Sequence, residues 1–221
     1  MRDFAEIYEI AADRKGGPDA LERRLSTPLT PVQLAATGDD RWLAAMAKCL
    51  FQAGFNWQVI DAKWPGMEDA FEHFDPHRVA AYHDDDIDRL LADRRIVRNG
   101  AKVMAVIENA RFIRQIAGEH GGFGAFVANW PGESYDALLS VLSKQGARLG
   151  SVTGQRVLRS MGKDSYILSP DVVARLIAEG VVDKPPTSKR DLAATQAAFN
   201  AWAEQSGRSL THISQILAYS V

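Results

Sequence analysis

The chain has 221 residues, which is enough for one sizeable core or for one domain with a smaller lobe. Hydrophobic residues make up 46% and charged residues 24%, as in an ordinary globular protein, and no apolar run approaches the roughly 20 residues that span a bilayer. The N-terminus lacks the charged-then-apolar pattern of a signal peptide, so we expect a cytoplasmic protein without membrane contact. Cys49 is the only cysteine, which excludes an intramolecular disulfide and any cluster of cysteine ligands.

The net charge of −2 argues weakly against a nucleic-acid partner, but the charge is unevenly distributed. Five basic residues and no acidic one lie between residues 144 and 163, and six basic residues against one acid lie between residues 94 and 114. A chain that is acidic overall can still present one cationic face to phosphates. Either run taken alone is better explained as a solvated helix face.

Helical periodicity runs through nearly the whole chain, and no segment keeps the period of two that a half-buried strand shows. Glycine, proline and capping residues bound the expected helices. These cover residues 1–16, 19–25, 31–36, 40–53, 57–62, 67–74, 77–81, 84–93, 101–119, 123–128, 134–146, 154–162, 170–179, 188–205 and 210–218. The pattern predicts an all-α fold, with residues 1–35 as an N-terminal helical extension and residues 36–221 as the main domain.

Residues 142–158 are predicted to form two helices joined by a tight turn. Gly150 and Gly154 bracket Val152, a small apolar side chain that can fill the gap between the helices, and glycine permits close backbone approach or a positive φ. The second helix then begins with free N–H groups and the positive end of its dipole, which suits a phosphate. An ordinary helix–helix corner explains the motif alone equally well.

A carboxylate follows this hairpin. Asp171 comes 17 residues after Gly154 and lies at the start of a predicted helix, directly after Ser169 and Pro170. A carboxylate at that point could face a cleft. The plainer explanation is a helix cap or a partner of the helix dipole, which is what an Asp at a helix start most often is.

Two groups of motifs resemble a known superfamily. The hairpin followed by Asp171 resembles the helix-hairpin-helix DNA glycosylases, an all-helical superfamily with a catalytic Asp shortly after the hairpin. Residues 49–115 are more specifically similar to DNA-3-methyladenine glycosylase I, and the matching stretches are Gln52–Trp57, Phe71–Pro76 with Val79 and Ala80, Ile96–Asn99, Lys102 with Val103, and Asn109 with Ala110. The resemblance covers about residues 40–180 and implies a two-lobed architecture with the active-site cleft between the lobes.

The chain departs from that family at three places. The family binds zinc through two Cys and two His, which this chain lacks, and Asp171 stands where the second zinc His would fall; we therefore expect no metal and no cofactor. Cys49 replaces the family's pocket Glu, three residues before Gln52. The lysine of bifunctional lyases is absent near the start of the hairpin's second helix, where Gln155 stands, which implies hydrolysis without strand cleavage.

The resemblance implies a monofunctional N-glycosylase that flips a damaged base out of double-stranded DNA and releases an alkylated purine such as 3-methyladenine. Trp57 would wall the base pocket, Gln52 would read a base edge, and Asp171 would stabilise the oxocarbenium-like sugar or orient water. Further aromatic candidates for the pocket are Phe51, Trp42 and Tyr166, and for each aromatic candidate, Trp57 included, a core role is at least as well supported. Cys49 either lines the pocket or is a buried small hydrophobic residue. The predicted contacts to the DNA backbone are Leu149, Gly150, Val152, Gly154, Gln155 and Arg156. We expect the protein to act as a monomer.

Two alternatives remain open at this point. A lesion-binding module of the same fold that has lost catalysis is suggested by Cys49 and by the missing zinc ligands. An all-helical interaction protein unrelated to DNA is the third hypothesis, and the absence of DNA affinity at low salt would favour it.

Overall fold

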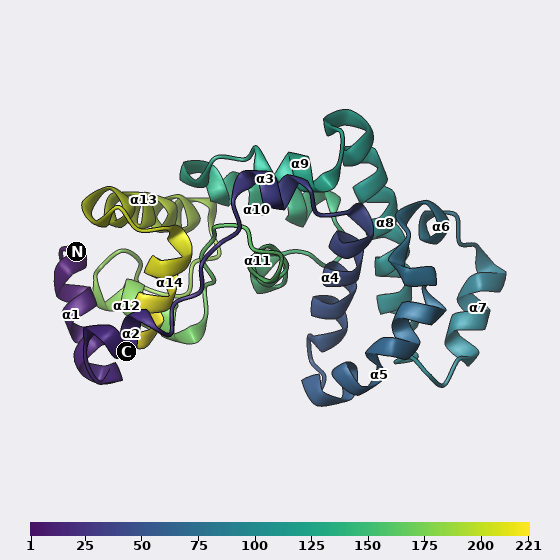
Figure 1. Cartoon of the computed structure of the whole chain (residues 1–221), viewed down its shortest axis with the longest axis horizontal. Coiled ribbons are helices and arrows are strands. Elements are labelled where there is room, and N and C mark those ends of the chain that lie inside the picture. Colours follow the sequence, from purple (N-terminus) through teal and green to yellow (C-terminus); the bar gives the residue numbers. More distant parts are fainter. The chain divides into compact units, whose positions relative to one another are not determined.

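The computed structural model describes all 221 residues apart from the side chain of Ser151, and the described residues form helices without a strand (Figure 1). The prediction of an all-α fold is confirmed. The α-helices are α1 (Phe4–Lys15), α2 (Pro18–Glu22), α3 (Pro31–Ala35), α4 (Asp39–Gln52), α5 (Trp57–Ala70), α6 (Pro76–Ala80), α7 (Asp84–Ala92), α8 (Gly100–His120), α9 (Phe123–Ala128), α10 (Tyr135–Gln145), α11 (Ser151–Ser160), α12 (Pro170–Ala178), α13 (Lys189–Ser206) and α14 (Leu210–Tyr219). Two 3-10 turns are η1 (Glu72–Phe74) and η2 (Gly132–Ser134).

The longest helix, α8, begins and ends close to where the sequence predicts. The side chain of Asn99 accepts a hydrogen bond from the N–H of Lys102, which caps the first turn. Gly121 ends the helix in the left-handed conformation, with φ 75°. Short polar caps and a terminal glycine are local signals, and for this reason the bounds of α8 are readable from sequence.

The prediction for residues 57–74 is wrong. Instead of two short helices, α5 runs without a break through Pro65, and residues 72–74 form a 3-10 turn with positive φ values. Proline removes one helical hydrogen bond, but Ile60 and Met67 are fully buried on either side of it, and their burial offsets that loss. The left-handed turn lets Phe74 stack on Phe71, with ring centroids 5.3 Å apart.

The chain divides into two compact units by its internal contacts. The first unit comprises residues 1–29, 130–138 and 162–221, and the second comprises residues 30–129 and 139–161. In the first unit, α1 contacts α13 and α14, so the N-terminal segment packs against the C-terminal helices. The boundary between residues 35 and 36, and the cleft between lobes, stay predictions.

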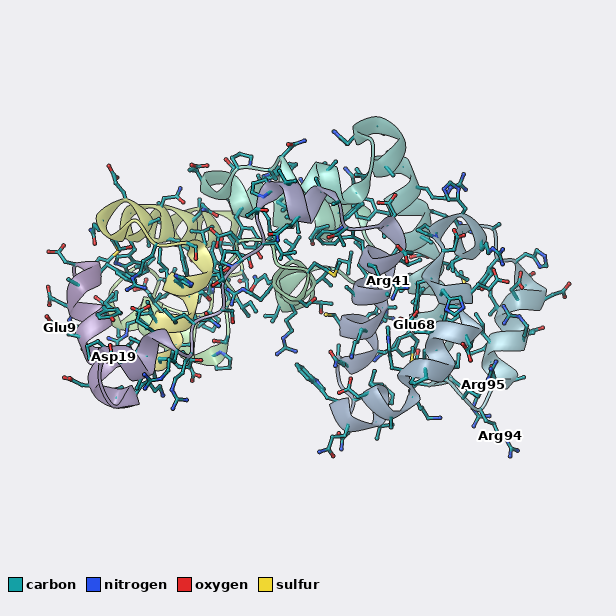
Figure 2. All side chains as sticks on the ribbon, viewed as in Figure 1. Glu9, Asp19, Arg41, Glu68, Arg94 and Arg95 are labelled. Carbon is teal, nitrogen blue, oxygen red and sulfur yellow. The ribbon has the colours of Figure 1, made fainter. Side chains whose placement is uncertain are left out.

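The second unit is built around α8, which contacts α4, α6, α7 and α9. The inward face of α8 is apolar, with Val103, Val106 and Ile113 fully buried. An ion pair joins α4 to α5: the guanidinium of Arg41 lies 3.1 Å from the carboxylate of Glu68, and both residues are labelled in Figure 2. Over the described residues, none of the helices combines the length and the apolar character needed to cross a membrane.

Candidate nucleic-acid interface

The predicted hairpin is present in the structure, and its turn, residues 146–150, joins α10 to α11. The prediction that the second helix begins at Gly154 is wrong, because α11 begins at Ser151 with Gly150 as its N-cap. Gly154 therefore lies inside the helix, where a Cβ would come within 2.4 Å of the carbonyl oxygen of Leu149. Glycine here serves close backbone approach, and the positive φ of the turn belongs to Arg148 instead.

A buried amide fixes the hairpin turn to α8. The Nδ2 of Asn109 donates to the carbonyl oxygen of Ala147 at 3.1 Å, and the N–H of Ala147 donates to the Oδ1 of Asn109 at 2.8 Å. Asn109 is fully buried, so this reciprocal pair satisfies polar groups that would otherwise be costly. Sequence reasoning assigned Asn109 no role, although a lone amide in an apolar helix face was the available signal.

Three members of the basic run are exposed: Lys144, Arg148 and Arg156. Among the described residues, no carboxylate lies within the 4.0 Å ion-pair distance of any of these three cations. Lys163, from the same run, is instead buried in the first unit and donates from its Nζ to the carbonyl oxygen of Trp130 at 2.5 Å. The hairpin thus presents unpaired positive charge, although the run contributes fewer exposed cations than its length suggests.

An exposed aromatic loop, which comprises residues 53–56 and Trp57 at the start of α5, follows α4. The side chains of Phe55 and Trp57 are 42% and 49% exposed, which is unusual for large rings in a folded unit. The guanidinium of Arg156 lies over the ring of Trp57, 5.3 Å from its centroid, in cation–π geometry. Two residues predicted separately, one for the base pocket and one for the DNA backbone, are therefore neighbours.

A buried lysine, Lys102, forms hydrogen bonds with the backbone where this loop begins. The Nζ of Lys102 donates to the carbonyl oxygens of Phe51 at 3.1 Å and Ala53 at 2.8 Å, and it lies 4.4 Å from the ring centroid of Phe55. Burial lowers the pKa of Lys102, and the nearby charge of Arg148 lowers that pKa further. The sequence analysis named Lys102 only within a stretch that resembles the family and gave it no role, because a lysine at a helix start is usually a solvated charge.

Cys49 lies on α4, on the side of α11. Burial raises the pKa of its thiol, while a hydrogen bond with Ser160 and the charges of Arg156 and Lys48 act to lower that pKa. The net shift is upward, so the side chain is a neutral thiol near pH 7. Arg156 thus acts on both Cys49 and Trp57, and the structure brings these three predicted residues together. Gln52, in the last turn of α4, is half-buried.

Three other pocket candidates lie in the cores of the units. Trp42 and Phe51 are fully buried in the second unit, where the ring of Trp42 packs on Phe123 at 5.3 Å. Tyr166 is fully buried in the first unit, stacked on Phe199 at 4.3 Å, and burial raises the pKa of its phenol. Their burial favours the core role that the sequence left open.

Asp171 is exposed in the first turn of α12, in the first unit. It is not the cap of that helix, because the hydroxyl of Ser169 accepts the hydrogen bond from the N–H of Val172 at 3.3 Å. Its carboxylate is consequently not consumed by capping, though it lies where the helix dipole favours negative charge. The catalytic role of Asp171 stays a prediction.

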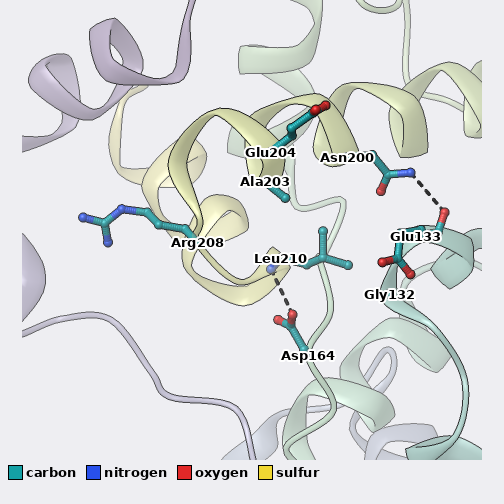
Figure 3. Close-up of a pocket in the computed structure, with 8 residues that line it drawn as sticks. All are labelled: Gly132, Glu133, Asp164, Asn200, Ala203, Glu204, Arg208 and Leu210. Atoms are coloured by element: carbon teal, nitrogen blue, oxygen red, sulfur yellow. Dashed lines mark hydrogen bonds between the residues drawn. The ribbon is translucent and has the colours of Figure 1, made fainter.

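Two cavities lie away from these residues. One, of about 390 Å³ in the first unit, is lined by polar side chains that include Asp164 and Asn200; Asp164 accepts from the N–H of Leu210 at 3.1 Å (Figure 3). The other, of about 570 Å³ in the second unit, is lined mainly by acids such as Asp40 and Asp69. Neither includes a predicted site residue. In the described part of the chain, no three His, Cys, Asp or Glu side chains are placed to share a metal ion.

Known proteins resemble this chain in sequence and in structure. Residues 35–146 match the family model described as methyladenine glycosylase. A DNA-3-methyladenine glycosylase 1 of Escherichia coli is 37% identical over 34% of this chain and 41% of its own length, and a DNA-3-methyladenine glycosylase of Haemophilus influenzae is 33% identical over 27% and 32%. The chain therefore spans less than half the length of the curated relatives it matches. A 3-methyladenine DNA glycosylase I from Staphylococcus aureus, described for its recognition of 3-methyladenine, superposes with a TM-score of 0.51 at 25% identity, over 62% of this chain and 80% of that one.

Proposed function

This chain belongs to the methyladenine glycosylase family, and from that premise we propose that it is a monofunctional DNA N-glycosylase acting on alkylated purines in base-excision repair. The observation that carries the proposal is the cation–π contact between Arg156 and the half-exposed ring of Trp57. Arg156 lies on the second helix of the hairpin and has no carboxylate partner among the described residues. Arg156, proposed to contact the DNA backbone, and Trp57, proposed to stack on the base, thus lie side by side in one compact unit. The substrate class follows the named relatives, which are 3-methyladenine glycosylases.

The hairpin is proposed to hold the phosphate backbone of duplex DNA. The N-cap of α11 is Gly150, which has no side chain to cap the first N–H groups, and Lys144, Arg148 and Arg156 add positive charge beside them. These contacts are independent of base sequence, which suits an enzyme that must search long stretches of undamaged DNA. We propose that a monomer makes them.

Trp57 is proposed to receive the extruded base. Removing a nucleotide from the stack costs a few kcal/mol, and stacking on an aromatic ring restores roughly 1–3 kcal/mol of that. Gln52, whose amide both donates and accepts, is proposed to read the base edge. Cys49 contributes no charge as a neutral thiol, and a methylated, cationic purine needs little proton donation to leave.

Asp171 is proposed to assist the bond-breaking step. Hydrolysis of the N-glycosidic bond builds positive charge on the sugar, which a carboxylate stabilises directly or by orienting the attacking water. The exposed position of Asp171 and the separate cap at Ser169 leave its carboxylate available for that role.

Release of free base from methylated duplex DNA tests the proposal. We expect release by the wild type and a loss of at least tenfold in Asp171→Asn, with Asp191→Asn as the matched control. Asp191 also lies in the first turn of a helix capped by a serine, Ser188, and in the same unit. No release by the wild type, or undiminished release by Asp171→Asn, would contradict the mechanism.

The neutral thiol of Cys49 favours one second candidate, a lesion-binding module without catalysis. That protein would bind duplex DNA in a salt-dependent manner, with preference for a methylated site, and would release no base. Binding and release measured on the same duplex separate the two functions.

A further inference from the structure

We propose that Lys102 and Asn109 are positioning residues that hold the aromatic loop and the hairpin turn in register along α8. The inference rests on the proposed function, since it assigns both segments to DNA. Neither residue is expected to touch the base or the phosphates. Each binds the backbone of another segment, and together they set the distance between the aromatic loop and the hairpin turn.

Lys102 fixes the path by which the chain leaves α4. Its ammonium donates to the carbonyl oxygens of Phe51 and Ala53, which lie at the end of a helix where carbonyls have lost their intrahelical partners. The same ammonium lies over the ring of Phe55 at 4.4 Å. A buried charge placed so is stable only while the loop keeps this shape, because its desolvation is otherwise uncompensated.

Asn109 fixes the hairpin turn in a similar way. Its amide exchanges two hydrogen bonds with the backbone of Ala147, the residue before Arg148, which is held at φ 57°. A left-handed non-glycine residue is unfavourable unless its surroundings enforce it. The amide of Asn109 supplies that enforcement from a fully buried position.

Because Lys102 and Asn109 lie on one rigid helix, α8 fixes the distance between the two segments that they bind. Seven residues are almost two turns of an α-helix, so both side chains leave the same face, at a separation of about 10 Å along the axis. Buried Val103, Val106 and Ile107 lock the intervening turns into the core. A displacement of reacting groups by about 1 Å can cost on the order of 100-fold in rate, so a fixed spacing has a direct catalytic consequence.

Hydrogen exchange measures the positioning without reference to activity. Lys102→Met, which keeps the apolar stem, should speed exchange in a peptide covering residues 53–57 at least fivefold and leave residues 146–150 unchanged. Asn109→Ala should do the reverse. The matched control is Lys63→Met, because the Nζ of Lys63 also donates to a backbone carbonyl in this unit, that of Arg94 at 2.8 Å. Global loosening of both segments in either variant would overturn the assignment.

Kinetics then separate positioning from simple stability. In single-turnover release, Lys102→Met should lower the maximal rate by 10- to 100-fold while its Kd for undamaged duplex changes less than twofold. Asn109→Ala should weaken that Kd by at least fivefold. Equal changes in rate and affinity in both variants would overturn the proposal. Should either variant fail to fold, Lys102→Gln and Asn109→Ser, which keep part of the hydrogen bonding, take the same measurements. Absence of base release by the wild type would contradict only the proposed function. The hydrogen-exchange pattern tests the positioning of the two segments without any measurement of activity.

Discussion

Trp57 combines two properties at the scale of a single residue. Its ring is half-exposed, so the chain forgoes part of the free energy that burial of an indole provides. One face also carries the guanidinium of Arg156, which must move or share that face when a base stacks there. The same side chain is therefore poised for a planar ligand and close to the cation that holds the strand.

Replacing Trp57 tests the stacking directly. Loss of the ring in Trp57→Ala removes roughly 1–3 kcal/mol, which corresponds to a drop of about 5- to 150-fold in base release. Trp57→Phe keeps an aromatic face and should retain most of the rate. Equal losses in the two variants, measured by single-turnover release, would show that the ring does not stack on the base.

The thiol of Cys49 gives a prediction on pH. Only the thiolate is alkylated, and burial raises the pKa of this thiol above that of an ordinary cysteine. Fewer thiolates then exist at any given pH near 8, so iodoacetamide should react several-fold more slowly with the native protein than with the urea-unfolded chain. The pH profile of the rate should lie to the alkaline side. Arg156→Gln should slow alkylation further, because Arg156 acts to lower that pKa. A native rate equal to the unfolded one would contradict the prediction.

At the scale of elements, the hairpin depends on close contact between its turn and its second helix. A Cβ at Gly154 would lie 2.4 Å from the carbonyl oxygen of Leu149, which is backbone and cannot yield cheaply. Gly118, inside α8, has no atom within 4 Å of the corresponding position. The two glycines therefore differ in the reason for their presence.

Alanine substitutions distinguish these glycines. Gly154→Ala should destabilise the protein by about 1–3 kcal/mol through overpacking, and it should weaken DNA binding with it. Gly118→Ala should stabilise the protein by up to about 1 kcal/mol, because alanine is the better helix former. Denaturant unfolding of both variants provides the comparison, and a stabilised Gly154→Ala would show that the contact is not tight.

Local signals explain which elements the sequence predicted well. Caps and terminal glycines placed α8 and α13 within two residues, because those signals act over a single turn. The path through Pro65 was missed because the burial of Ile60 and Met67 is a tertiary effect. The contacts of Lys102 and Asn109 could not be predicted for the same reason. Their partners, the carbonyls of Phe51, Ala53 and Ala147, are far away in sequence.

At the scale of the whole molecule, two units are assembled from interleaved segments. Residues 1–29 and residues 162–221 belong to the same compact unit, although they are far apart in the sequence. No local pattern in the sequence indicates that these two segments belong to one unit. Of the candidate site, Trp57, Cys49, Arg156 and the hairpin share the second unit, whereas Asp171 belongs to the first. The family resemblance assigned these residues to one site, but only the structure shows that Arg156 interacts with both Trp57 and Cys49.

The uneven charge of the molecule gives a last prediction. The net charge is −2, yet the hairpin carries Lys144, Arg148 and Arg156 without carboxylate partners among the described residues. If these cations meet phosphates, the logarithm of the DNA association constant falls linearly with the logarithm of salt concentration, with a slope of about −0.9 per phosphate neutralised. Each glutamine variant at these positions should reduce the slope by about 1 and weaken binding to all sequences alike. Arg94→Gln, which removes an exposed arginine outside the hairpin, is the control and should leave the slope unchanged. Anisotropy titrations of an undamaged duplex over a range of salt give the slopes, and a slope unaltered in all three hairpin variants would place the DNA on another face.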